Sequence, residues 1–164
     1  MAQVPGISSR LVPVLSQMEL TSSKYCNITG SLRTTRNSST IELHLDILER
    51  MHYGKMNTGY YIRTSAADNW IYNKTFDFCT FLVRPNLDRL MNLVREELRR
   101  RGPMPTRCPI DKGLISFQNC SLSYIRIPAF LPQSKFGLVI QTFTGKQMEP
   151  VFRAVIQGRL KLIN

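Results

Sequence analysis

The chain has 164 residues, of which 43% are hydrophobic, enough for one folded domain with a sizeable core and too few for two ordinary domains. No stretch reaches the roughly eighteen uninterrupted apolar residues that a membrane-spanning helix needs. The formal net charge of +11, from 22 Lys and Arg against 11 Asp and Glu, predicts attraction to an anionic partner.

The positive charges are spread along the chain, and the one tight run, Arg99-Arg100-Arg101, ends a predicted helix. Cations are favourable there on structural grounds, because the helix C-terminus carries partial negative charge. We therefore do not expect nucleic acid as the partner.

Residues 1–22 are expected to form a poorly ordered leader, followed by a single domain over residues 23–164. Residues 11–20 contain no apolar core of a signal peptide, and Pro5 and Pro13 would interrupt one. Three alternatives remain open: a signal that lies upstream, a misplaced start, or a protein that is not secreted.

Strict alternation of apolar and polar residues over 40–47 predicts a half-buried strand. A turn is expected at Asn57-Thr58-Gly59, followed by a short strand at 60–62. The aromatic segment 70–82 is predicted to be a further strand.

The period changes at residues 86–101, where Leu87, Leu90, Met91, Val94 and Leu98 recur at helical spacing. This predicts one amphipathic helix, ended by Gly102 and Pro103. Further strands are predicted at 114–118, 122–127, 136–143 and 151–162. Many short strands separated by turn signals indicate a mainly β fold, an antiparallel β-sandwich.

Four cysteines, Cys26, Cys79, Cys108 and Cys120, match no zinc-binding pattern. An even number in a small domain suggests disulfides and an oxidising compartment. Sequons for N-glycosylation agree with this and begin at Asn27, Asn37, Asn73 and Asn119. We therefore expect a secreted glycoprotein.

Several segments together resemble an insect family of uncharacterised secreted proteins that is related to the lipid-recognition (ML) domain. The segments are FDFCTFL at 76–82, the helix at 86–101, Cys108-Pro109-Ile110, Leu131-Pro132, and the earlier Tyr25-Cys26-Asn27. The resemblance covers about residues 24–160. Family members carry a further N-terminal cysteine and a signal peptide, which this chain does not show.

The resemblance implies an immunoglobulin-like two-sheet cup that opens between its sheets to admit a lipid. With it we predict the pairings Cys79–Cys108 and Cys26–Cys120, although four cysteines allow three connectivities. It also implies a monomer that carries or senses a hydrophobic ligand, in a chemosensory or immune process, with a membrane receptor as a further partner.

No catalytic motif, metal site or cofactor site is expected. His44, between Glu42 and Asp46, could suggest a metal site or part of a triad, but it fits a solvated strand face better. Nucleophile elbows, zinc-protease motifs and glycine-rich phosphate loops do not occur. The protein is therefore expected not to be an enzyme.

A binder must leave part of its sandwich interior unfilled, and aromatic residues would line that space. The candidates for lining are Trp70, Tyr72, Phe76, Phe78, Phe117, Phe136, Phe143 and Phe152. Arg84, Arg89 and Arg95 are the candidates for rim charges that would meet an anionic head group.

Two other functions remain open. One is an extracellular interaction module with a packed core, whose basic face binds a receptor or an anionic glycan. The other is intracellular nucleic-acid binding, which free thiols and unmodified sequons would favour.

Overall fold

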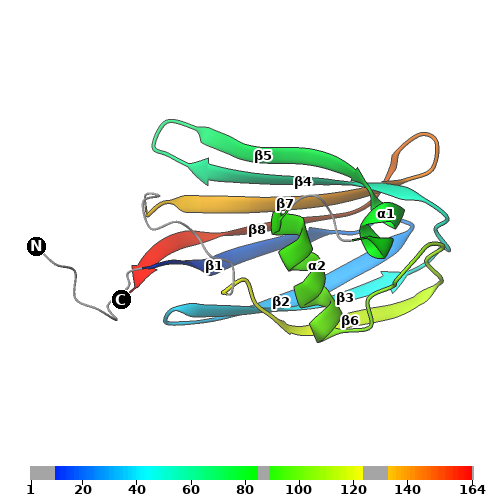
Figure 1. Ribbon diagram of the computed structural model, residues 1–164, viewed down its shortest axis with the longest axis horizontal. Helices are drawn as coiled ribbons and strands as arrows, with labels where there is room; N and C mark the ends of the chain where they lie inside the picture. Colours follow the sequence, from blue (N-terminus) through cyan, green and yellow to red (C-terminus); the bar gives the residue numbers. More distant parts are fainter. Residues whose placement is uncertain (1–9, 85–88, 124–132, 164) are drawn as a thin grey trace, which may run out of the picture.

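The computed structural model describes residues 10–84, 89–123 and 133–163. Within them the chain folds into two antiparallel sheets packed as a β-sandwich, which confirms the predicted fold class (Figure 1). The larger sheet has five strands in the order β1 (Arg10–Thr21), β8 (Glu149–Ile163), β7 (Lys135–Thr144), β4 (Gly54–Arg63) and β5 (Asp68–Asp77). The smaller sheet has three strands in the order β2 (Cys26–Thr35), β3 (Ser38–Ile47) and β6 (Gly113–Cys120).

Two helices follow β5, namely α1 (Phe78–Val83) and α2 (Arg89–Arg101). Helix α2 confirms the predicted amphipathic helix, whose first residues lie outside the described part of the chain. Helix α1 corrects the prediction that 70–82 is one strand. Asp77 stops the strand and caps the helix, because its carboxylate accepts a hydrogen bond from the Thr80 backbone N–H at 2.9 Å.

The helices close one side of the sandwich. Helix α1 packs against β4 and β5, and α2 packs against β6 (Figure 1). We call α1 and α2 the helical cover. None of the helices in the described residues is long and apolar enough to cross a membrane.

Strand β1 corrects the prediction of a disordered leader over 1–22, of which residues 1–9 lie outside the described chain. It pairs with β8 from Arg10↔Ile163 to Thr21↔Arg153. Because β1 is an edge strand, Pro13 can lie within it without removing a needed ladder hydrogen bond. The folded domain therefore begins by Arg10 rather than at residue 23.

Strand β4 runs through the segment Asn57-Thr58-Gly59, where a turn was predicted. Gly59 serves packing there rather than a turn, because it leaves room for the Trp70 ring, from which a Cβ at this position would lie 2.5 Å. The predicted strand at 122–127 lies mostly outside the described residues, and Leu122 and Ser123 do not form a strand.

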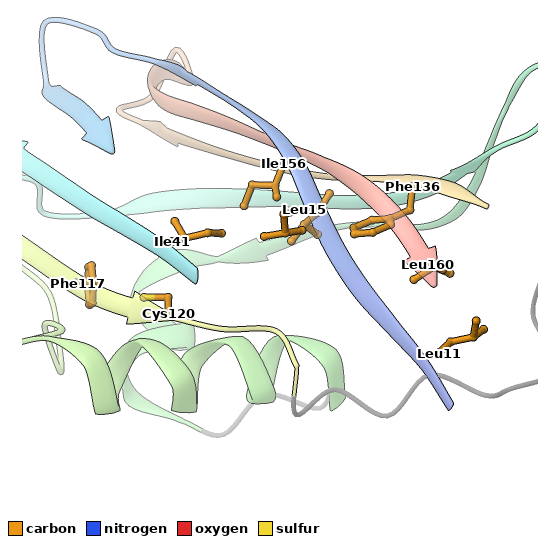
Figure 2. Packing of buried hydrophobic residues seen from close by; sticks show 9 residues of the cluster. Leu11, Leu15, Ile41, Phe117, Cys120, Phe136, Ile156 and Leu160 are labelled. Atoms are coloured by element: carbon orange, nitrogen blue, oxygen red, sulfur yellow. The ribbon is translucent and has the colours of Figure 1, made fainter. Parts of the chain in front are cut away.

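Two hydrophobic clusters lie between the sheets. The first joins β1, β7 and β8 of the large sheet to β3 and β6 of the small one (Figure 2). Its buried members include Leu11, Leu15, Ile41, Phe117, Cys120, Phe136, Ile156 and Leu160. The second cluster includes Phe81, Leu82 and Met91 from the helical cover.

Candidate functional site

An apolar cavity of about 180 Å³ lies between the two sheets and the helical cover. Both sheets and both helices contribute to its wall. The helices present Phe78, Phe81, Leu82, Met91, Val94 and Leu98. Of the described residues that line the cavity, Tyr53 is exposed, at 40%, and the others are buried or half-buried. The cavity therefore approaches the surface beside Tyr53.

Few polar side chains line the cavity. Apart from tyrosine and cysteine, those in the described residues are Glu97, Ser121 and Thr142. Glu97 is buried but already paired: its Oε2 accepts from the Ser121 backbone N–H at 2.7 Å and from Arg101 Nε at 3.2 Å. No described Lys, Arg or His lines the cavity. Its wall can therefore hold hydrocarbon but offers no cation to a buried anion.

Four of the eight predicted lining aromatics reach the cavity, namely Phe78, Phe117, Phe143 and Phe152. The other four, Trp70, Tyr72, Phe76 and Phe136, do not line it. Phe136 belongs to the packed core, and Phe76 is partly buried against the second cluster.

Trp70 faces outward because β5 carries a bulge. Tyr60 pairs with Tyr72 but Tyr61 pairs with Trp70, which leaves Ile71 as the extra residue. The bulge reverses the alternation, so Trp70 is 52% exposed and packs on Tyr61, with ring centroids 4.9 Å apart.

Sequence reasoning missed most of the wall. Methionines contribute to it strongly, through Met51, Met56, Met91 and Met104. Met is flexible enough to fit irregular apolar space, so these residues could adapt to a guest. Two polar residues of the wall could be recognised from the sequence. Glu97 interrupts the apolar face of α2, and Thr142 follows the inward apolar residues Phe136, Leu138 and Ile140 of β7.

Two of the three predicted rim charges, Arg84 and Arg95, do not line the cavity. Arg95 is 6% exposed and lies between the helices, where its Nη2 donates to the Leu82 carbonyl at 3.1 Å and its Nη1 meets Glu96 at 3.3 Å. It therefore holds the helical cover together, and the rim prediction is wrong for this residue. Arg84 is exposed at the end of α1. The Arg89 side chain lies outside what the structure describes.

A disulfide joins Cys79 to Cys108, as predicted. The predicted Cys26–Cys120 pair is wrong, since both are buried free thiols. Cys26 pairs with Ile47 on one side of β3, and Cys120 pairs with Ile41 on the other. Ile41 and Ile47 are six residues apart on β3, a distance of roughly 20 Å along the strand. The two cysteines beside them are therefore much further apart than the roughly 7 Å that a disulfide allows between Cα atoms.

The two free thiols are expected to be unreactive. Burial, with a smaller contribution from the carboxylates of Asp46 and Glu97 respectively, raises the pKa of Cys26 and of Cys120 to about 11. At pH 8 the thiolate is therefore scarce as well as inaccessible. Ellman's reagent should detect no thiol in the native protein and two in denaturant without reductant. Finding none in denaturant would contradict this arrangement.

All four sequon asparagines are exposed. Asn27, Asn73 and Asn119 lie on the edge strands β2, β5 and β6, and Asn37 lies in the turn between β2 and β3. These positions are accessible to modification.

His44 does not lie at the cavity. Its Nδ1 is 2.8 Å from Ser116 Oγ, and its Nε2 is 3.8 Å from Glu42 on the same strand. No cluster of three or more His, Cys, Asp or Glu that could hold a metal ion occurs among residues 10–84, 89–123 and 133–163.

The model of a family described as a protein of unknown function (DUF1091) matches residues 56–138, half of the chain. The chain belongs to this family. The DUF1091 match takes in β5, the helical cover, the Cys79–Cys108 disulfide and β6, and of these the helical cover, Cys108 and β6 line the cavity. No curated protein matches the chain.

Proposed function

We propose that this DUF1091 protein is a secreted, non-enzymatic carrier of a hydrophobic ligand. The observation that carries the proposal is the apolar cavity between the sheets. Protein interiors are normally close-packed, with few voids larger than a water molecule. A cavity of about 180 Å³ lined by aliphatic, aromatic and methionine side chains is therefore unusual in a domain of this size.

The size of the cavity limits the ligand. An engineered apolar cavity of about 150 Å³ stays dry and binds benzene. Pockets for drug-sized ligands run from about 300 to 1,000 Å³. The present cavity, at about 180 Å³, thus suits a slender guest, such as one hydrocarbon chain, rather than a bulky one.

Several further observations support an extracellular carrier. The resemblance to secreted insect proteins related to the lipid-recognition domain predicts a two-sheet cup. One disulfide and four exposed sequons agree with an oxidising compartment. The chemosensory or immune role, the monomeric state and the membrane receptor follow the resemblance alone.

The competing interaction module needs a filled interior and a basic face. A hollow of about 410 Å³ does lie on the outer face of the large sheet, beside Trp70. Its charged side chains are Glu19, Asp68 and Arg153, so acids outnumber bases. An anionic glycan is therefore disfavoured there.

Filling the cavity tests the proposal. Ala154 lines it and is buried, so Ala154→Phe would place a ring in the space that the ligand needs. We expect the dissociation constant for methyl cis-parinarate, a slender fluorescent polyene with a neutral end group, to rise at least tenfold. Native mass spectrometry of wild-type protein from a eukaryotic host should also show a co-purified apolar molecule.

Val155→Phe is the matched control, because Val155 is the next residue of β8 and packs on the opposite face with Tyr61 and Val139. Its affinity for the probe should change less than threefold. Circular dichroism would verify that both variants fold. Unchanged binding in folded Ala154→Phe, or no binding by the wild type, would refute the carrier function.

A further inference from the structure

Thr142 is a polar residue in a cavity wall that is otherwise mostly apolar. It is 5% exposed, its side chain lines the cavity, and its Oγ1 has no hydrogen-bond partner. Its neighbours in register are Met56 on β4 and Phe152 on β8, which also line the cavity. Their side chains offer no strong hydrogen bond, and a buried water would need two to four polar partners.

A buried hydroxyl without a partner is destabilising, because it loses its hydrogen bonds to water and gains none in the protein. Valine has nearly the same shape as threonine and would avoid this cost. Thr142 lies between the apolar Ile140 and the paired Thr144, whose Oγ1 donates to the Tyr53 carbonyl at 2.7 Å. The hydroxyl at position 142 thus has no structural use within the described residues.

Thr142 also lies near the point where the cavity approaches the surface. Two residues further along β7, Thr144 pairs with Gly54, which follows the exposed Tyr53. Rotation about the Cα–Cβ bond exchanges the methyl and hydroxyl groups of threonine between staggered positions. The hydroxyl can therefore meet the outer end of a chain that enters beside Tyr53.

We propose that the ligand is a neutral, oxygenated hydrocarbon, such as a fatty alcohol or ester, whose oxygen forms a hydrogen bond with Thr142 Oγ1. This rests on the proposed carrier function and specifies its ligand class. A hydroxyl can donate or accept, so it pairs with an alcohol, a carbonyl or an ester oxygen.

The charge of the wall argues for a neutral ligand. A buried carboxylate needs a cation or several donors, and no described Lys, Arg or His lines the cavity. The only ionisable carboxyl group of the described wall is Glu97, which is already paired with Arg101 and so leaves that cation unavailable to an anionic ligand. A fatty acid is therefore a poorer guest than the alcohol of equal length.

The test compares n-decane, 1-decanol and decanoate at pH 7.4, measured by displacement of methyl cis-parinarate, whose own affinity is determined for each variant. We expect Thr142→Val to weaken 1-decanol binding about tenfold, the equivalent of one lost hydrogen bond. Binding of n-decane should change less than twofold, and decanoate should bind wild-type protein more weakly than 1-decanol.

Thr58→Val is the matched control. Thr58 is 0% exposed and its Oγ1 is also unpartnered, but it does not line the cavity. It should leave the affinities for all three compounds within twofold. Both variants should keep or raise the urea midpoint of unfolding, because each removes a buried hydroxyl that has no partner.

The outcomes separate the two proposals. If n-decane binds but Thr142→Val changes decane and decanol equally, or changes neither, the hydrogen bond is refuted and the carrier function stands. An equal decanol loss in Thr58→Val, or tighter binding of decanoate than of decanol, also refutes it. If none of the three binds wild-type protein, both proposals fail.

Discussion

Replacing Cys79 and Cys108 together with serine is expected to lower the free energy of unfolding by about 3 to 4 kcal/mol. The two residues are 29 positions apart, so their disulfide removes the closure entropy of a medium-sized loop from the unfolded chain. A domain of this size has a total stability of about 5 to 15 kcal/mol, so the loss would be a large part of it.

The position of the disulfide adds a functional consequence. Cys79 belongs to α1 and Cys108 follows α2, so the closed loop contains the helical cover except for Phe78. Cys108 itself lines the cavity, and Ile110 is joined to Met51 by backbone hydrogen bonds of 2.8 and 2.9 Å. Without the disulfide we expect weaker binding of an apolar probe, because the cover is less firmly held over the cavity.

Urea unfolding of wild-type and doubly substituted protein, with and without dithiothreitol, measures the effect. Reductant should bring the wild type to the stability of the variant and leave the variant unchanged, because Cys26 and Cys120 are already free. A loss below 1 kcal/mol, or an equal response of both proteins to reductant, would contradict the assigned pairing.

The fold class was predictable because its signals are local. Strict alternation over 40–47 predicts a strand, which the structure places at Ser38–Ile47, and the helical period over 86–101 predicts the helix described at Arg89–Arg101. Helix α1 was missed because it is only six residues long and rich in aromatics, so that only the capping Asp77 distinguishes it from the strand before it.

Features that depend on pairing between distant segments were not predictable. The bulge at Ile71 exists only relative to β4, and it decides whether Trp70 faces the cavity or the solvent. The separation of Cys26 from Cys120 likewise depends on their positions along β3. Residue types alone contain neither piece of information.

Whether a cavity remains depends on how far the two sheets and the helical cover lie from one another. Inward residues such as Phe117 and Phe152 can be recognised from their alternation, but the same pattern serves a filled core and a hollow one. The helical cover and the small sheet together leave the space unfilled. Polar residues at inward positions, namely Glu97 and Thr142, are the sequence signals that indicate something besides packing.

Leu15→Ala is expected to lower the free energy of unfolding by about 3 kcal/mol, because it removes a large buried side chain and leaves a void. Leu15 is 2% exposed and belongs to the cluster in Figure 2. The pairing of β1 with β8 has a bulge at Ser16, and next to this bulge the Leu15 backbone bonds to the smaller sheet. Its N–H donates to Ser39 Oγ at 2.8 Å, and its carbonyl accepts from Thr34 Oγ1 at 2.6 Å.

Strand β1 thus connects the two sheets rather than trailing from one of them, and the Leu15 substitution measures that connection. Gln17→Ala, on the same strand with an exposed side chain, should change the stability by less than about 0.5 kcal/mol. Urea unfolding followed by circular dichroism compares the two variants. If Leu15→Ala is as mild as Gln17→Ala, β1 is not part of the core, and the large sheet would end at β8 with the cluster open to water.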